Sequence, residues 1–112
     1  MTESSFTPTY PKVTIVGAGS IGRGWAALCA AHDWPTVVFD QDARLADQAI
    51  TEIARRATAL VSLGRADAAL VAHGLRGVQV GRSLLHACGP ADWIIESVAE
   101  DLALKQRLFD NI

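Results

Sequence analysis

The chain has 112 residues, a formal net charge of −2 and a hydrophobic fraction of 50%. This length suits one small domain, and the apolar fraction is large enough for a real core. The weak net charge and the lack of a basic stripe disfavour nucleic acid as a partner. No run of about 18 apolar residues occurs, so no membrane-spanning helix is predicted.

The start of the chain and its cysteines favour a cytoplasmic location. Residues 1–11 contain Pro8 and Pro11 among polar residues and lack the charged-then-apolar layout of a signal peptide. We expect them to form a flexible arm. Cys29 and Cys88 are far apart and fit no metal-ligand spacing, which predicts small buried hydrophobes in a reducing compartment, with a redox pair as the alternative.

The first half of the chain alternates between strand and helix signals. Residues 13–16 are an apolar, β-branched run, which is typical of a central parallel strand buried on both faces. Residues 20–31 predict a helix of small and apolar residues, and residues 36–39 predict a second strand. Apolar residues then recur at a helical period over residues 42–63, and Gly64 is suited to end that helix.

The second half continues the alternation with shorter elements: a helix over 67–72 ending near Gly74, a strand over 78–80, a helix or turn over 83–88, a strand over 93–97, and a last helix beginning near Glu100. This order predicts the N-terminal part of a Rossmann-type, doubly wound parallel α/β sheet with strand order 3-2-1-4. We expect residues 12–112 to be only part of a domain of this fold, without its later strands or a second domain.

The most informative motif follows the first predicted strand. Gly17-x-Gly19-x-x-Gly22 opens the first helix, and Asp40 ends the second strand 18 residues after Gly22. In the dinucleotide-binding fingerprint the first glycine makes the turn, the second admits the pyrophosphate, and the third allows close packing. The helix N-terminus attracts the phosphates. Glycines that serve turn geometry alone are the alternative.

Asp40 also bears on the choice of cofactor. A carboxylate at this position is suited to accept hydrogen bonds from the adenosine ribose, and it repels a 2′-phosphate, so NAD is favoured over NADP. A helix-capping role is the alternative, although Asp42 is better placed to cap. Arg44 could hold a 2′-phosphate, but a solvated helix residue is the plainer interpretation.

Three segments, VTIVGAGSIGRGWA, VVFDQD and DWIIESVAEDLALKQRLF, resemble the NAD-binding domain of the 3-hydroxyacyl-CoA dehydrogenase family. The resemblance covers about residues 12–112, so it implies a partial NAD-binding Rossmann domain without the family's substrate and dimerisation domain. Its most discriminating part is the fourth strand with Ser97, followed by Glu100 and, five residues later, Lys105. Residues 21–25 look more like the lambda-crystallin (L-gulonate 3-dehydrogenase) branch than the fatty-acid branch.

The resemblance implies cofactor-binding residues at matching positions. Backbone groups from Ala18 to Ile21 would contact the pyrophosphate, Asp40 and Gln41 would hold the adenosine ribose, and three side chains would lie near the nicotinamide. The full set is Gly17, Ala18, Gly19, Ser20, Ile21, Gly22, Asp40, Gln41, Ser97, Glu100 and Lys105. Many members have proline where this chain has Ala99; proline would fix φ before Glu100, whereas alanine leaves that loop freer.

Several of these side chains have plainer interpretations. Glu100 could simply be a first-turn acid favoured by the helix dipole, and Lys105 a surface lysine paired within its helix. Arg23 is read as a surface or helix-terminal residue, with charge compensation for the pyrophosphate as the alternative. Two expectations concern groups of residues: Trp25 and Trp93 are expected mostly in the core, and Arg55 and Arg56 on a solvated helix face.

The resemblance implies an oxidoreductase that oxidises the hydroxyl of a 3-hydroxy acid or 3-hydroxyacyl-CoA by hydride transfer to NAD, as a homodimer. The family's catalytic His, Ser and Asn would lie downstream, so no catalytic residue is expected here. His32 and His73 are expected to face solvent or to cap, and no role is assigned to His86. The alternative is a non-catalytic nucleotide-binding or structural, crystallin-like protein.

Overall fold

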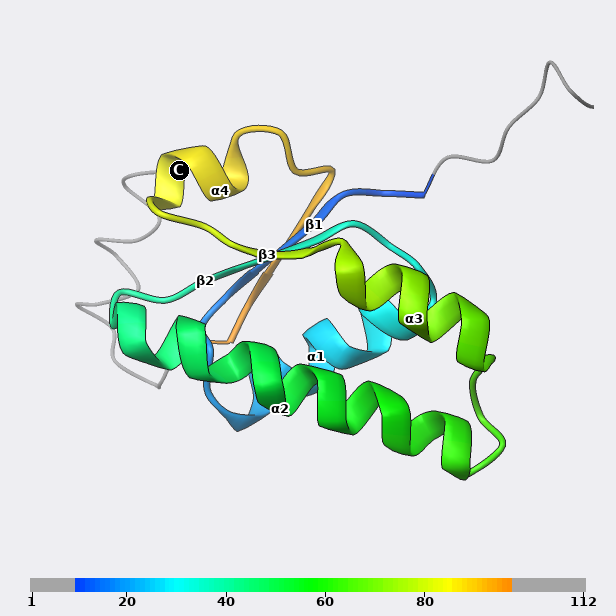
Figure 1. Cartoon of the computed structure of the whole chain (residues 1–112). Coiled ribbons are helices and arrows are strands. Elements are labelled where there is room, and N and C mark those ends of the chain that lie inside the picture. Colours follow the sequence, from blue (N-terminus) through cyan, green and yellow to red (C-terminus); the bar gives the residue numbers. More distant parts are fainter. Residues whose placement is uncertain (1–9, 98–112) are drawn as a thin grey trace, which may run out of the picture.

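The computed structural model describes residues 10–97. The elements in this range are β1 (Val13–Val16), α1 (Ser20–Ala31), β2 (Thr36–Phe39), α2 (Ala43–Ser62), α3 (Ala68–Arg76), β3 (Val78–Val80), α4 (Leu84–Cys88) and β4 (Trp93–Glu96), as labelled in Figure 1. The last predicted helix and most of the predicted N-terminal arm lie outside the described residues.

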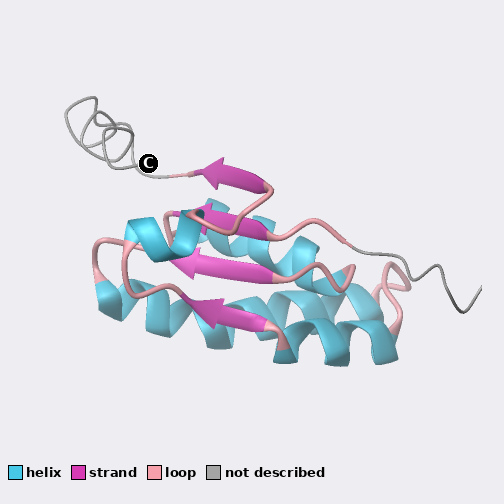
Figure 2. Ribbon diagram, turned by 90° about the horizontal axis from the view of Figure 1, so that it is seen from above, coloured by secondary structure: helices cyan, strands magenta, loops and turns pink. Residues whose placement is uncertain are grey.

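The four strands form one parallel sheet in the order β3-β2-β1-β4, which confirms the predicted fold (Figure 2). β1 is central, and all four of its residues are buried. In register, Val16 at the end of β1 faces Phe39 of β2 on one side and Glu96 of β4 on the other. The residues that follow these three strands therefore meet at one edge of the sheet.

The helices lie on both faces of the sheet. Figure 1 shows α1, α2 and α3 on one face and α4 on the other. Small residues let α1 approach the sheet and the neighbouring helices closely. Its buried residues are Gly22, Ala26, Ala27, Cys29, Ala30 and Ala31. Fully buried Ile15 of β1 and Ile53 of α2 belong to the same core; burying such a side chain contributes about 1.5–3 kcal/mol.

Two element boundaries differ from the sequence prediction. The helix expected to end near Gly74 continues to Arg76, because Gly74 is a packing residue rather than a stop. A Cβ on Gly74 would overlap with the carbonyl oxygen of Ala30, so its absence lets α3 pack on α1. β4 ends at Glu96, one residue before Ser97. As expected, Gly64 follows the end of α2 and has φ +71°.

The expectation that both tryptophans are mostly buried is wrong. Trp25 is 46% exposed and Trp93 is 62% exposed. The helical period of α1 turns its small residues inward and leaves Trp25 partly exposed, whereas Trp93 begins β4, which is an edge strand among the described residues. Both tryptophans border an apolar groove of about 400 Å³, lined by Trp25, Leu28, Cys29, His32, Trp34, Trp93 and Ile95.

The cysteines are buried and unbridged, and they belong to different clusters. Cys29 is part of the main core, whereas Cys88 packs with Val16 and Leu84 in a smaller one on α4. Burial raises the pKa of both thiols. Among residues 10–97, no helix has the length and apolarity needed to cross a membrane.

Candidate cofactor site

The carboxyl ends of β1, β2 and β4 are joined by backbone hydrogen bonds. The amide of Gly17, just after β1, donates to the carbonyl of Phe39 at 2.7 Å. The amide of Ser97, just after β4, donates to the carbonyl of Val16 at 2.8 Å. Gly17 has φ +113°, a conformation that favours glycine and lets the chain turn sharply into α1. Ligands of open α/β sheets bind at such strand ends.

Gly22 makes the close packing beneath this turn possible. A Cβ on Gly22 would overlap with the carbonyl oxygen of Gly17 and lie 2.8 Å from Ser97 Oγ. The hydroxyl of Ser97 in turn lies 3.3 Å from the carbonyl oxygens of both Val16 and Gly17, to which it can donate. The glycine turn, the start of α1 and the end of β4 therefore fit together only without a side chain at Gly22.

The N-terminus of α1 has the properties of an anion site. Gly19 is its N-cap, and no side chain caps the first turn. The amides of Ser20, Ile21 and Gly22 consequently have no intrahelical acceptor. No acidic residue occupies the first turn, and a Cβ on Gly19 would meet nothing within 4 Å. Open space, free amides and the positive end of the helix dipole together suit a phosphate group.

Asp40 lies beside this turn and is held by two backbone amides. Its Oδ2 accepts from the amide of Ala18 at 2.7 Å, and its Oδ1 accepts from the amide of Asp42 at 2.8 Å. Asp42, as expected, caps α2 by accepting from the amide of Arg44 at 3.0 Å. Because a carboxylate has about four lone-pair sites, Asp40 retains acceptor capacity for ribose hydroxyls.

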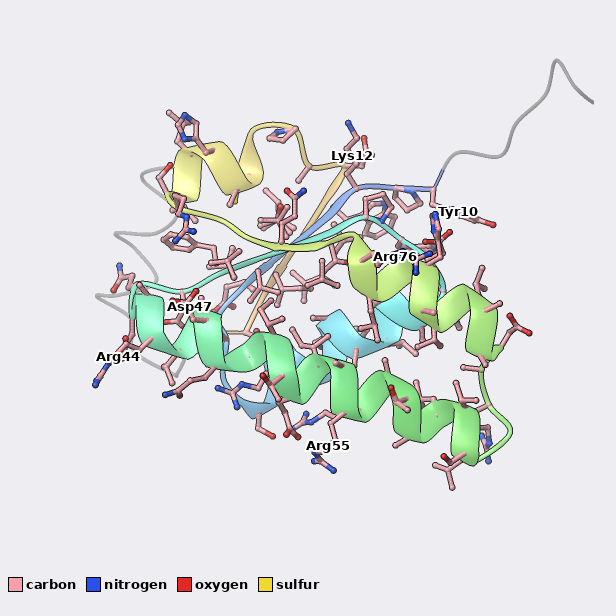
Figure 3. The ribbon with its side chains drawn as sticks, viewed as in Figure 1. Tyr10, Lys12, Arg44, Asp47, Arg55 and Arg76 are labelled. Carbon is pink, nitrogen blue, oxygen red and sulfur yellow. The ribbon has the colours of Figure 1, made fainter. Side chains whose placement is uncertain are left out.

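The neighbours of Asp40 are open to solvent. Gln41 is exposed. The side chain of Arg44 is 87% exposed, and its Nε lies 3.8 Å from Asp42 Oδ1. Figure 3 shows this side chain pointing away from the body of the molecule. This agrees with a solvated helix residue and gives no pre-formed arrangement for a 2′-phosphate.

Two arginines bind the backbone around the glycine turn. Arg23 Nε donates to the carbonyl of Ala18 at 2.8 Å. Arg56, from α2, donates through Nη1 to the carbonyl of Ser20 at 2.7 Å and through Nη2 to Ser20 Oγ at 3.1 Å. The expectation of a solvated face is therefore wrong for Arg56 and right for Arg55, whose side chain is 70% exposed.

Sequence reasoning had no signal for the contact between Arg56 and Ser20. The pairing of Glu52 with Arg55 and Arg56 follows from helix spacing at i,i+3 and i,i+4. The contact with Ser20 joins residues 36 positions apart and depends on how α2 crosses α1. No periodicity in either helix indicates that crossing.

His32 and His73 lie toward the amino ends of the strands, since His32 shortly precedes β2 and His73 pairs with Asp33. His86 lies on α4. His32 is exposed at the end of α1, and His73, exposed on α3, forms an ion pair with Asp33 at 2.7 Å when protonated. Within residues 10–97, no group of three or more His, Cys, Asp or Glu side chains could hold a metal ion. Of the predicted site residues, Glu100 and Lys105 lie outside the described residues, whereas Gly17 to Gly22, Asp40, Gln41 and Ser97 lie at one edge of the sheet.

These residues fit a nicotinamide dinucleotide. The space at Gly19, which a Cβ would fill, adjoins the free amides of α1, and the Asp40 carboxylate borders the same turn. The bound cofactor would supply a hydride acceptor or donor, while the protein would supply binding and orientation.

Comparison with known proteins agrees with this fit. Residues 12–112 match the family described as "3-hydroxyacyl-CoA dehydrogenase, NAD binding domain". The chain is 30% identical over 100 residues to 3-hydroxyadipyl-CoA dehydrogenase of Escherichia coli (strain K12), covering 89% of this chain and 21% of that protein. It is 29% identical over 113 residues to the lambda-crystallin homolog of Rattus norvegicus, covering 95% and 34%.

A solved structure shows the same fold. The crystal structure of 3-hydroxybutyryl-CoA dehydrogenase from Escherichia coli K12 superposes with a TM-score of 0.76 at 28% identity, covering 91% of this chain and 21% of that one. The chain thus spans between a fifth and about a third of the length of these relatives. Relatives of both branches match at similar identity, so the lambda-crystallin branch stays a prediction. The chain belongs to the 3-hydroxyacyl-CoA dehydrogenase family and carries the sequence of its NAD-binding domain.

Proposed function

We propose that the cofactor binds across the carboxyl ends of β1, β2 and β4. The pyrophosphate lies at the N-terminus of α1 on the amides of Gly19 to Gly22, and the adenosine ribose lies on Asp40. The observation that carries this proposal is the hydrogen bond between Asp40 and Ala18, which holds a carboxylate beside the uncapped end of α1. Because Ala18 donates its amide to Asp40, the amides that follow it are the ones free for phosphate.

The remaining predicted residues have roles at the two ends of this site. Gln41, exposed next to Asp40, would border the adenosine ribose. Ser97, at the end of β4, would border the nicotinamide side, and we propose that Glu100 and Lys105 act on that side as well. The position of Ser97 against Gly17 supports this direction, since it places the β4 end across the turn from Asp40.

We further propose that Asp40 selects NAD over NADP. A 2′-phosphate on the ribose would bring two negative charges close to the carboxylate, and like charges at such distances repel. The exposed Arg44 does not point into the site and offers no pre-formed counter-charge.

For the protein to which this domain belongs, we propose oxidation of the hydroxyl of a 3-hydroxy acid or 3-hydroxyacyl-CoA with NAD as hydride acceptor. The names of the relatives support this assignment. Membership of the family also underlies the proposal that the whole protein is a homodimer, which sedimentation or size-exclusion measurements on the whole protein test. The two buried, unbridged cysteines support the separate proposal that the whole protein acts in the cytoplasm.

The decisive experiment is calorimetric titration of the chain with NADH and, separately, NADPH. Asp40→Asn removes the charge but keeps an acceptor oxygen, and Asp47→Asn, on the exposed face of α2, is a matched control with the same change in charge. We expect the unaltered chain to prefer NADH, Asp40→Asn to bind NADH about tenfold more weakly and to discriminate less against NADPH, and the control to be unchanged.

Two results would contradict the proposal. A folded chain that binds neither nucleotide has no functional site of this kind. Equal affinities of Asp40→Asn and Asp47→Asn for NADH would mean that Asp40 does not contact the ribose. Circular dichroism of each variant separates a lost contact from a lost fold.

A further inference from the structure

The charge around the N-terminus of α1 is unusual for a helix. Cations are disfavoured at helix N-termini because the dipole already places positive charge there. Nevertheless, Arg23 and Arg56 both donate to carbonyl oxygens of the glycine turn, and the first turn of α1 contains no acid. An anion at the free amides of this turn would relieve the repulsion.

Arg56 and Arg55 form a natural comparison. Both pair with Glu52, through Arg56 Nε at 2.8 Å and Arg55 Nη2 at 2.6 Å. Arg55 points away from the molecule in Figure 3, whereas the side chain of Arg56 is only 31% exposed and reaches Ser20. Glu52 neutralises one of the two charges, so the cluster of Glu52, Arg55 and Arg56 keeps a net charge of about +1.

The contact of Arg56 with Ser20 involves both the backbone and the side chain. Two different guanidinium nitrogens bind Ser20 O and Ser20 Oγ, at 2.7 Å and 3.1 Å. A Cβ on Gly24, one turn further along α1, would lie 3.5 Å from Arg56 Nη1, so the guanidinium lies against the first turn. Lysine cannot reproduce this pair of hydrogen bonds from two nitrogens, because its ammonium group has only one.

We infer that Arg56 is a positioning residue for the cofactor pyrophosphate, acting from outside the glycine motif. By holding the carbonyl and the hydroxyl of Ser20, it fixes the first turn of α1 and the direction of its free amides. Its charge adds to the positive potential at that turn. This inference rests on the proposed location of the pyrophosphate.

The test compares Arg56→Gln with Arg55→Gln, which remove the same charge from adjacent positions. Calorimetry with three ligands gives the readout: NADH and ADP, which contain a pyrophosphate, and adenosine, which does not. We expect Arg56→Gln to bind NADH and ADP about tenfold more weakly with little change for adenosine. Arg55→Gln should change each affinity less than about twofold.

A second variant covers the case in which Arg56→Gln does not fold. Arg56→Lys keeps the charge but not the double contact, so we expect it to recover part of the ADP affinity and to remain weaker than the unaltered chain. A merely structural Arg56 would instead lower the affinity for adenosine as much as for ADP. That result, or equal effects of Arg55→Gln and Arg56→Gln on a chain that binds NADH, overturns the inference. If the unaltered chain binds neither NADH nor ADP, the proposed function fails and the inference fails with it.

Discussion

The carboxylate of Asp40 accepts a hydrogen bond of 2.7 Å from the amide of Ala18, and so joins the end of β2 to the glycine turn after β1. A second hydrogen bond, from the amide of Gly17 to the carbonyl of Phe39, joins the same two segments through the backbone. Asp40 is therefore fixed in place by the protein itself. A site ordered in advance spends less free energy on ordering when a ligand binds.

Replacing Asp40 should lower stability as well as cofactor affinity. Asp40→Ala leaves the amide of Ala18 without its acceptor, so we expect the free energy of unfolding to fall by about 1–3 kcal/mol. Asp47→Ala, on an exposed helix face, should change it by less than about 0.5 kcal/mol. Urea unfolding followed by circular dichroism measures both. Equal stabilities of the two variants would show that the Ala18 contact contributes nothing.

The second and third glycines of the motif should respond differently to alanine. A Cβ on Gly22 overlaps with the Gly17 carbonyl, so we expect Gly22→Ala to lose about 1–3 kcal/mol of stability or more. A Cβ on Gly19 enters open space, so Gly19→Ala should fold normally and lose affinity for NADH. Thermal unfolding and calorimetry distinguish the two, and a Gly19→Ala chain that binds NADH normally would move the pyrophosphate elsewhere.

Stability should depend on Glu52 at low pH. Hydrogen bonds from Arg55, which has the larger effect, and from Arg56 lower the pKa of Glu52 from 4.5 to about 2. A carboxyl group whose pKa is lower in the folded state stabilises the fold above its unfolded pKa and loses that contribution as pH falls. The loss therefore lies between about pH 4.5 and pH 2. Comparing the unfolding of Glu52→Gln and the unaltered chain across this window should show a difference that shrinks toward pH 2.

The two thiols should be unreactive in the folded chain. Burial raises the pKa of Cys29 and Cys88, which leaves less thiolate, the form that reacts. At pH 8 we expect a disulfide reagent such as dithionitrobenzoate to modify the native chain much more slowly than the chain in guanidinium. Immediate release of two equivalents of chromophore from the native chain would mean that the thiols are accessible.

Local patterns predicted much of the fold. The β-branched run at 13–16, the glycine spacing and the helical period of residues 42–63 each reflect a rule that acts over a few residues. The motif also placed Gly17 and Asp40 at neighbouring strand ends, because parallel strands joined by right-handed crossovers bring their carboxyl ends together.

Burial was less predictable than secondary structure. Trp25 and Trp93 are bulky and apolar, yet they border an open groove, because small residues form the buried face of α1 and because Trp93 lies on β4, an edge strand among the described residues. Gly74 reads as a helix stop in the sequence but lies inside α3, where contact with Ala30 requires the absence of a side chain. The exposure of the tryptophans and the packing of Gly74 both depend on which element lies against each residue.

The sequence by itself determined the alternation of strands and helices, the glycine turn and the acid that follows the second strand, since each is encoded by backbone preferences and spacing within one βαβ unit. Only the tertiary structure decided that Ala18 donates to Asp40 and that Arg56, but not Arg55, reaches Ser20. The physical reason is distance along the chain. Those contacts join segments 22 and 36 residues apart, and they exist only once α2 has crossed α1 and β2 has paired with β1.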